Sequence, residues 1–177
     1  VVLAEIFSTQ SNGYSYREMS DAAHNLLRSA IEKKYGISEN QVIILKDDKG
    51  KPYIEGRDDI FVSLSHSKGA VMCAVSDKEI GIDVELCAER RKSVESRVFT
   101  ESEITLINNA KDENKAFFTL WTLKESYLKA IGTGFADNAK NIEFFSVENP
   151  IKSNNQDYSF ETGEYEGFVF AVCEKKY

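Results

Sequence analysis

Short strand-like segments in this chain do not alternate regularly with helical ones. The strand-like runs lie at residues 1–7, 42–45, 60–64, 70–75, 80–86, 142–147, 158–161 and 167–173. Longer stretches at 20–34 and 112–131 place apolar residues at helical spacing, and a shorter helical signal lies at 102–108. Because a doubly wound parallel sheet requires a helix after almost every strand, this order predicts an α+β fold instead.

The chain divides into two parts of similar content near residue 90. Its 177 residues are enough for one domain, or for two small halves that share an interface. The polar stretch 88–96 is typical of a linker, and a helical segment with several strands lies on each side of it. We therefore predict an N-terminal half, residues 1–88, and a C-terminal half, residues 89–177.

Charge and composition exclude several classes of protein. The formal net charge of -7 disfavours nucleic acid as the main partner. No apolar run approaches the roughly 18–20 residues of a membrane-spanning helix, and the first residues do not resemble a signal peptide, so we expect a cytoplasmic protein. The 3 cysteines are widely spaced without a Cys-x-x-Cys pair, which supports neither a disulfide framework nor a zinc site.

Two acidic residues alternate with apolar ones in the segment 80–86. Successive side chains of a strand point to opposite faces, so Asp83 and Glu85 share one face. Two neighbouring carboxylates repel each other unless water or a cation neutralises them, and a hard divalent cation is one candidate. The alternative is an amphipathic strand whose acidic face is exposed to water.

The helical segment 117–131 carries a stripe of functional side chains. Trp121, Glu125 and Lys129 are four residues apart and therefore lie on one helix face. In one interpretation Glu125 and Lys129 form an ordinary surface ion pair. In the other, Glu125 is a third carboxylate at a metal, and Lys124 and Lys129 contact phosphate oxygens. Helical spacing alone leaves both open.

A Ser-His-Ser cluster ends the strand-like run that includes residues 60–64. The side chains of Ser65, His66 and Ser67 can hydrogen-bond phosphate oxygens, or they can simply cap a turn. A nucleophilic serine paired with His66 is disfavoured, because adjacent strand residues point to opposite faces and the chain has no Gly-x-Ser-x-Gly sequence.

Four motifs in order resemble one enzyme family. They are Gly50-Lys51-Pro52, Ser65-His66-Ser67, Gly81-Ile82-Asp83-Val84-Glu85 and the segment 121–129, WTLKESYLK. In order and spacing they resemble the 4'-phosphopantetheinyl transferases of the surfactin-synthetase-activating type. The resemblance implies two similar α/β halves related by a pseudo-twofold axis, with coenzyme A and the active site in the cleft between them.

The same resemblance implies roles for individual residues. Magnesium is expected at Asp83, Glu85 and Glu125, while Glu125, Lys129 and Asp83 are expected to act in catalysis. Contacts to coenzyme A are expected at Ser20, Arg28, Lys51, Ser65 and His66, to which the helix spacing adds Lys124. Glu103 is similar to a further acidic position of the family. The paired lysines that larger relatives place before the first helix have no clear match, and only Arg17 is nearby.

The resemblance also implies a reaction. The enzyme would move the phosphopantetheine group of coenzyme A onto a serine hydroxyl of an apo acyl or peptidyl carrier protein, giving the holo carrier and adenosine 3',5'-bisphosphate. Such carriers serve fatty acid, polyketide or nonribosomal peptide synthesis. Two fused halves would complete the site, so a monomer is expected. Because carriers of this kind are acidic, we suggest a docking patch in the segment 86–99, with Arg90, Arg91, Lys92 and Phe99.

Two other functions fit the same acidic residues. The first is a magnesium-dependent hydrolase acting on another nucleotide pyrophosphate, which would turn over without a carrier protein. The second is a non-catalytic module that binds coenzyme A or a carrier, for which removal of Asp83 or Glu125 would leave the biological effect intact.

Overall fold

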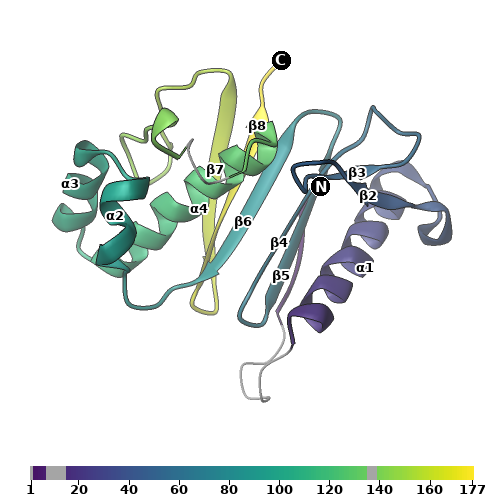
Figure 1. The fold of residues 1–177 in the computed structure, drawn as a ribbon, viewed down its shortest axis with the longest axis horizontal. Coiled ribbons are helices and arrows are strands. Elements are labelled where there is room, and N and C mark those ends of the chain that lie inside the picture. Colours follow the sequence, from purple (N-terminus) through teal and green to yellow (C-terminus); the bar gives the residue numbers. More distant parts are fainter. Residues whose placement is uncertain (1, 7–14, 135–138) are drawn as a thin grey trace.

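Two antiparallel sheets lie side by side in the fold, each with a long helix packed against it (Figure 1). The computed structural model describes residues 2–6, 15–134 and 139–177. The strands are β1 (Val2–Ile6), β2 (Ile44–Lys46), β3 (Pro52–Ile54), β4 (Phe61–Ser67), β5 (Ala70–Ser76), β6 (Ile80–Leu86), β7 (Tyr158–Tyr165) and β8 (Phe168–Lys175). The helices are α1 (Tyr16–Tyr35), α2 (Lys92–Val98), α3 (Glu101–Asn109) and α4 (Glu113–Ile131), with short 3-10 turns at Glu39–Gln41 and Ala139–Asn141.

The two larger sheets have the same strand arrangement. In the first the spatial order is β1-β5-β4, and in the second it is β6-β8-β7. In each, the last strand in sequence therefore lies in the middle. A separate two-stranded ribbon pairs β2 with β3. The described residues thus form a mixed fold of helices and antiparallel sheets, in agreement with the predicted mixture of strands and helices.

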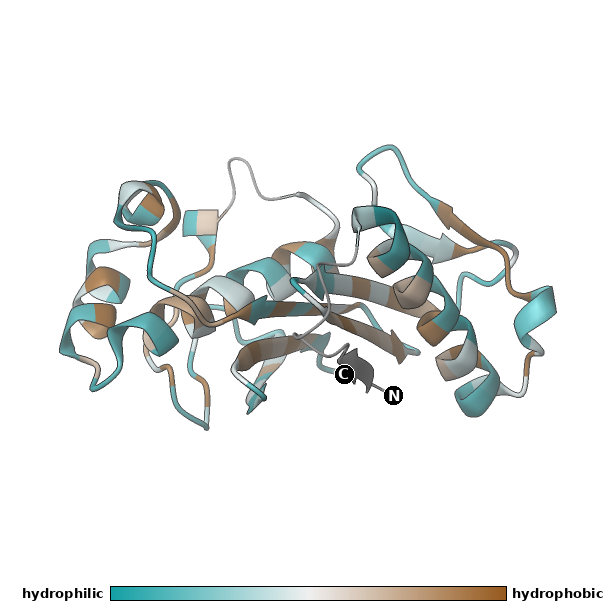
Figure 2. Cartoon of the chain, turned by 90° about the horizontal axis from the view of Figure 1, so that it is seen from below, coloured by the Kyte–Doolittle hydropathy of each residue, from teal (hydrophilic) through white to brown (hydrophobic). Residues whose placement is uncertain are grey.

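Helix α1 covers the first sheet. It buries five residues against the strands, at spacings of three and four: Met19, Ala23, Leu27, Ala30 and Ile31. The helix begins four residues before the predicted start, because Ser15 and Glu18 form a capping box that satisfies free amides of the first turn. Gly36, in the left-handed conformation, ends it. Figure 2 shows apolar strands through the middle of the molecule and hydrophilic segments on the helices and outer loops.

Helix α4 is the centre of the second core. Its fully buried Leu120 and Leu123 pack with Phe144 and Ala171, and α4 lies against both β6 and β8. The predicted strand at 142–147 is wrong, because this segment contributes just one isolated bridge, between Phe144 and Ser153. Among the described helices, none is long and apolar enough to cross a membrane.

The predicted linker at 88–96 is structured instead. Helix α2 begins at Lys92, and the Arg90 side chain, 8% exposed, lies against the helices that follow. Its guanidinium donates to Asn108 of α3 and lies 3.3 Å from Glu95 of α2 and 3.4 Å from Glu113 of α4. The polar sequence suggested a solvated linker. The contacts of Arg90 could not be read from it, because its partners lie up to 24 positions away in the chain.

The contact between α4 and β6 is unusually close at Gly81. A Cβ atom at this position would lie 1.9 Å from the backbone oxygen of Ser126 and 2.5 Å from the backbone nitrogen of Ala130. Neither atom can move without displacing the helix. The missing side chain therefore sets the separation between α4 and β6, and with it the reach of α4 side chains toward β6.

We expect Gly81→Ala to lower the free energy of unfolding by about 3 kcal/mol, at the upper end of the usual overpacking cost, because the added methyl group overlaps backbone atoms. Gly163→Ala is the matched control. Its Cβ would meet the ring of Phe170 at 2.3 Å, and a side chain can rotate away. Urea denaturation of both variants measures the difference. Equal stability of Gly81→Ala and the unsubstituted protein would contradict the close contact.

Candidate functional site

A cavity of about 350 Å³ lies where α1, β4, β6 and α4 meet. Most of the residues that the sequence singled out line it together. The lining includes Ser20, Ser65, His66, Asp83, Glu85, Glu125 and Lys129, with Tyr16, Ala23, His24, Lys46, Gly50, Pro52 and Leu64 completing the wall. Residues from both sheets therefore face one space.

Asp83 is the most buried acid of this cavity, with 4% of its surface exposed. Its Oδ1 accepts hydrogen bonds from the hydroxyl of Ser65 at 2.8 Å and from the ammonium group of Lys129 at 2.6 Å. Its Oδ2 is buried without a hydrogen-bond partner among the described residues. Since a buried carboxylate oxygen without a partner is costly, Oδ2 has capacity for a further ligand.

The other two carboxylates are destabilised as anions. Burial, followed by the negative charge of Asp83, raises the pKa of Glu125 to about 7, although Lys129 opposes the change. Burial also raises the pKa of Glu85, against the hydrogen bond of 2.7 Å that Glu85 accepts from Ser67. Two lysines, Lys46 and Lys129, therefore line the cavity with three acids, which leaves an excess of negative charge.

The acids of the cavity are not arranged as a finished metal site. Within the described parts of the chain, no three His, Cys, Asp or Glu side chains form a group that could hold a metal ion. Lys129 instead occupies the Oδ1 side of Asp83. Asp83, Glu85 and Glu125 nevertheless interact electrostatically, because the charge of Asp83 raises the pKa of both glutamates.

Helix α1 contributes one wall of the cavity. Ser20, a predicted coenzyme A contact, lines it, and so do Tyr16 and His24, which were not predicted as site residues. The His66 ring packs edge-on against Tyr16, with 5.0 Å between ring centroids, and burial followed by the charge of Lys129 lowers the pKa of His66. The signal that could have identified them is the spacing of 16, 20 and 24, which puts all three on one helix face.

Lys51 lies beside this cavity rather than in it. Its ammonium group donates to the backbone oxygen of Ala130, close to the C-terminus of α4, where the helix dipole favours a cation. Burial lowers the pKa of Lys51. Lys51 lines an adjoining cavity of about 150 Å³ whose wall also includes Glu125 and Lys129. The predicted nucleotide lysine is therefore next to the acidic cluster.

Two predicted coenzyme A contacts are not brought to either cavity. Lys124 is 0% exposed and pairs with Glu103 at 2.9 Å, while its ammonium group also donates to the backbone oxygens of Ala139 and Ile142. Arg28 donates to the backbone oxygen of Val42 at 3.4 Å. This geometry does not support contacts with phosphate for either residue. Glu103, a further acidic position in the resemblance, is committed to this buried pair.

Two of the four residues of the suggested docking patch are also unavailable to a partner. Arg90 is held in the contacts between helices described above, and Phe99 is 1% exposed inside the C-terminal core. Neither side chain is free to contact a partner protein. Arg91 and Lys92 remain exposed at the start of α2.

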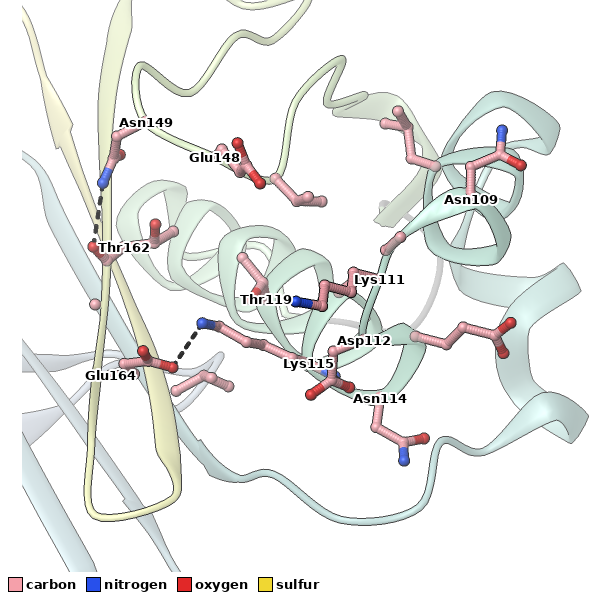
Figure 3. A pocket seen from close by; sticks show the side chains of 17 residues that line it. Asn109, Lys111, Asp112, Asn114, Lys115, Thr119, Glu148, Asn149, Thr162 and Glu164 are labelled. Carbon is pink, nitrogen blue, oxygen red and sulfur yellow. Dashed lines mark hydrogen bonds and ion pairs between the residues drawn. The ribbon is translucent and has the colours of Figure 1, made fainter.

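A larger cavity lies elsewhere, at the N-terminal end of α4 (Figure 3). It measures about 1080 Å³ and contains none of the predicted site residues. Along its walls Lys115 pairs with Glu164 at 2.7 Å, and the Asn149 amide donates to the backbone oxygen of Thr162. The acids of its wall, Asp112, Glu113, Glu148 and Glu164, are exposed, whereas the smaller cavity at β6 gathers the buried Asp83 and the half-buried Glu85 and Glu125. Size therefore does not identify the site here.

The buried Lys124–Glu103 pair yields a stability prediction. We expect Lys124→Met to lower the free energy of unfolding by about 3–5 kcal/mol, because Glu103 keeps a buried charge without its partner. Addition of Glu103→Gln should recover part of the loss, because it removes the buried charge. The backbone amides of Thr100 and Phe144 donate to different oxygens of Glu103, so the single amide oxygen of glutamine keeps one of these two hydrogen bonds.

Lys115→Met is the control for this prediction, because its pair with Glu164 is exposed and worth at most about 1 kcal/mol. Chemical denaturation of the three variants provides the measurement. If Lys124→Met lost less free energy of unfolding than Lys115→Met, this would contradict a structural role for the Lys124–Glu103 pair.

Comparison with known proteins agrees with this geometry. The sequence model of the 4'-phosphopantetheinyl transferase superfamily matches residues 79–173, which include Asp83, Glu85, Glu125 and Lys129. The 4'-phosphopantetheinyl transferase gsp of Aneurinibacillus migulanus is 34% identical over 126 residues, 67% of this chain and 52% of that protein.

Two further relatives give similar values. The 4'-phosphopantetheinyl transferase HetI of a Nostoc strain is 35% identical over 129 residues, 68% of this chain and 54% of that protein. For the 4'-phosphopantetheinyl transferase Sfp of Bacillus subtilis the identity is 33% over 113 residues, 63% of this chain and 50% of that protein. The chain spans about half the length of these relatives. By its matched residues, the chain belongs to the 4'-phosphopantetheinyl transferase superfamily, as the four motifs predicted.

Proposed function

We propose that this protein transfers the 4'-phosphopantetheine group of coenzyme A to a serine hydroxyl of an apo acyl or peptidyl carrier protein. The observation that supports this most is the meeting of Asp83, Glu85, Glu125 and Lys129 at one cavity. The names of the relatives support the same reaction class. The products would be the holo carrier and adenosine 3',5'-bisphosphate.

We further propose that Asp83, Glu85 and Glu125 hold magnesium. The donor set fits, since Mg²⁺ prefers carboxylate oxygens and Oδ2 of Asp83 is buried without a partner among the described residues. The excess of negative charge at the three acids favours a cation in the same way. When bound, magnesium would neutralise the acids and the pyrophosphate of coenzyme A.

The residues of the chain would then divide the remaining work. Glu125 faces the cavity and would accept the proton of the carrier serine. At the same time, the hydroxyl oxygen of that serine would form a bond to the β-phosphorus of coenzyme A. The bond from that phosphorus to the bisphosphate leaving group breaks in the same displacement. Lys129, held beside Asp83, would balance the charge that develops on the phosphate oxygens. Ser20 and His66 line the wall where the nucleotide end would lie.

A pseudo-twofold relation between two halves remains part of this proposal. The matching orders β1-β5-β4 and β6-β8-β7 support it, since each half would supply one strand, a helix and two further strands. Because β6 pairs with β8, the strand pairing favours a division just before Ile80 rather than at residue 88. Coenzyme A would lie where β4 of one half meets β6 of the other. A monomeric state, a cytoplasmic location and the pathway served stay predictions.

Intact mass measurement of apo carrier proteins tests the proposed reaction. With coenzyme A and magnesium, the mass of at least one carrier should rise by one phosphopantetheine. We expect Glu125→Gln to slow this transfer by about 10²–10⁴-fold, because general base catalysis contributes that much. Glu161→Gln, on an exposed position of β7, is the matched control and should keep the full rate.

The alternatives are separate outcomes of this measurement. Release of a nucleotide product without any carrier would indicate a hydrolase, and binding of coenzyme A without any mass gain would indicate a binding module. Either result would contradict the proposed transfer.

Removal of divalent cations tests the proposed metal site. Incubation with a chelator should abolish the mass gain, because three acids would then repel the pyrophosphate of coenzyme A, and added Mg²⁺ should restore it. Transfer at the full rate in the presence of excess chelator would show that the acids work without a metal.

A further inference from the structure

Serine residues occupy every second position of β4 where it faces β6. They are Ser63, Ser65 and Ser67, and the acids of β6, Asp83 and Glu85, are also two positions apart. Since strand side chains alternate between two faces, the three serines share one direction, and so do the two acids. The two strands belong to different sheets, yet they lie next to each other.

The serine hydroxyls first join the two sheets. The hydroxyl of Ser63 accepts from the backbone amide of Ile82 at 3.1 Å, and that of Ser65 accepts from the backbone amide of Val84 at 3.2 Å. Both contacts have the same sequence offset, so β4 and β6 run in the same direction. Side chains thus satisfy amides along the edge of β6, where its sheet has no further strand.

The same hydroxyls also bind the two acids. Ser65 donates to Oδ1 of Asp83 at 2.8 Å, and Ser67 donates to Oε2 of Glu85 at 2.7 Å. These two contacts again share one sequence offset. The repeat of two on β4 therefore matches the repeat of two on β6, and each acid receives its own serine. A shift of one residue would place Leu64 and His66 there instead.

Ser65 has no remaining hydroxyl proton for another acceptor. A hydroxyl group has one proton and two lone pairs, and Ser65 uses the proton on Asp83 while it accepts from Val84 and from Lys129 at 3.0 Å. Ser65 is also 6% exposed. Ser65 and Lys129 thus both donate to Oδ1 of Asp83, whereas Oδ2 stays buried without a hydrogen-bond partner among the described residues.

We infer that Ser65 and Ser67 of β4 are positioning residues, which fix the orientation of the Asp83 and Glu85 carboxylates across the junction of the two sheets. The inference rests on the proposed function, because it treats these acids as metal ligands. Neither serine contacts the reacting group in this account. Each serine determines which carboxylate oxygen is hydrogen-bonded to β4 and which is left for a ligand. Residues of the first half of the chain therefore orient the acids of the second half.

The test measures metal affinity directly, with Mn²⁺ as the paramagnetic probe and without coenzyme A or carrier. Partners that orient metal ligands typically contribute 10–100-fold to affinity, so Ser67→Ala should weaken Mn²⁺ binding by about that factor. Ser67→Thr keeps the hydroxyl and should restore affinity. Ser67 is the better test position, because it is half-buried and its loss removes fewer contacts than the loss of Ser65.

Ser63→Ala is the matched control on the same strand. The hydroxyl of Ser63 contacts the backbone of β6 but neither acid, so this variant should unfold at lower urea concentration yet bind Mn²⁺ within about 2-fold of the unsubstituted protein. If Ser63→Ala weakened Mn²⁺ binding as much as Ser67→Ala, both losses would reflect a general disturbance of the junction between the sheets. This result would overturn the inference.

The remaining outcomes separate the inference from the proposed function. Unchanged Mn²⁺ affinity in Ser67→Ala, with a carrier still modified by the unsubstituted protein, would overturn the positioning role and leave the transferase intact. No Mn²⁺ binding and no modified carrier with the unsubstituted protein would overturn both.

Discussion

The contact of α4 with Gly81 positions the chemical groups of this protein. Gly81 carries no Cβ, and an added one would lie 1.9 Å from the backbone of Ser126. At this separation Lys129 reaches Asp83 at 2.6 Å, and Glu125 faces the same cavity. The contact also connects two levels of the structure, since the residues that pack the second core and the residues that line the site alternate along the same helix.

The site carries an imbalance of charge. Asp83 forms an ion pair with Lys129 while it is 4% exposed, and two further acids lie at the same cavity. Burial disfavours carboxylate anions, and the two lysines of the wall, Lys46 and Lys129, cannot neutralise three of them. A bound cation would neutralise the excess negative charge and could bind Oδ2 of Asp83, which has no hydrogen-bond partner among the described residues. Both features are reasons to propose magnesium at this site. The four acids that line the larger cavity at the N-terminus of α4 are exposed.

Local periodicity was enough to predict much of this site. The alternation in β6 placed Asp83 and Glu85 on one face, and the spacing of four in α4 placed Glu125 and Lys129 on one stripe. Both patterns depend on neighbours in the same strand or helix. The family resemblance then supplied Ser20 and His66, and the structure brings both to the cavity.

Partners that are distant in the chain could not be predicted this way. Helical spacing could not predict that Lys124 is buried against Glu103, because Glu103 lies 21 positions earlier in the chain. Only the packing of the folded protein brings the two side chains together. The contacts of Arg90 with Asn108 and Glu113 were likewise not predictable from neighbouring residues. They hold the segment that was predicted as a linker against helices α3 and α4. The serine contacts between β4 and β6 depend on how two sheets meet, which no single segment encodes.

The acids at the junction of the sheets are proposed to hold both the metal and the pyrophosphate of coenzyme A. A crystal structure with coenzyme A and Mn²⁺, located by its anomalous scattering, tests it most directly. We expect the metal within coordination distance of Asp83 Oδ2, with the pyrophosphate beside Lys129 and the hydrogen bonds from Ser65 and Ser67 retained. Metal and coenzyme A bound at the larger cavity near Lys115, with the acids of β6 unchanged, would contradict the account.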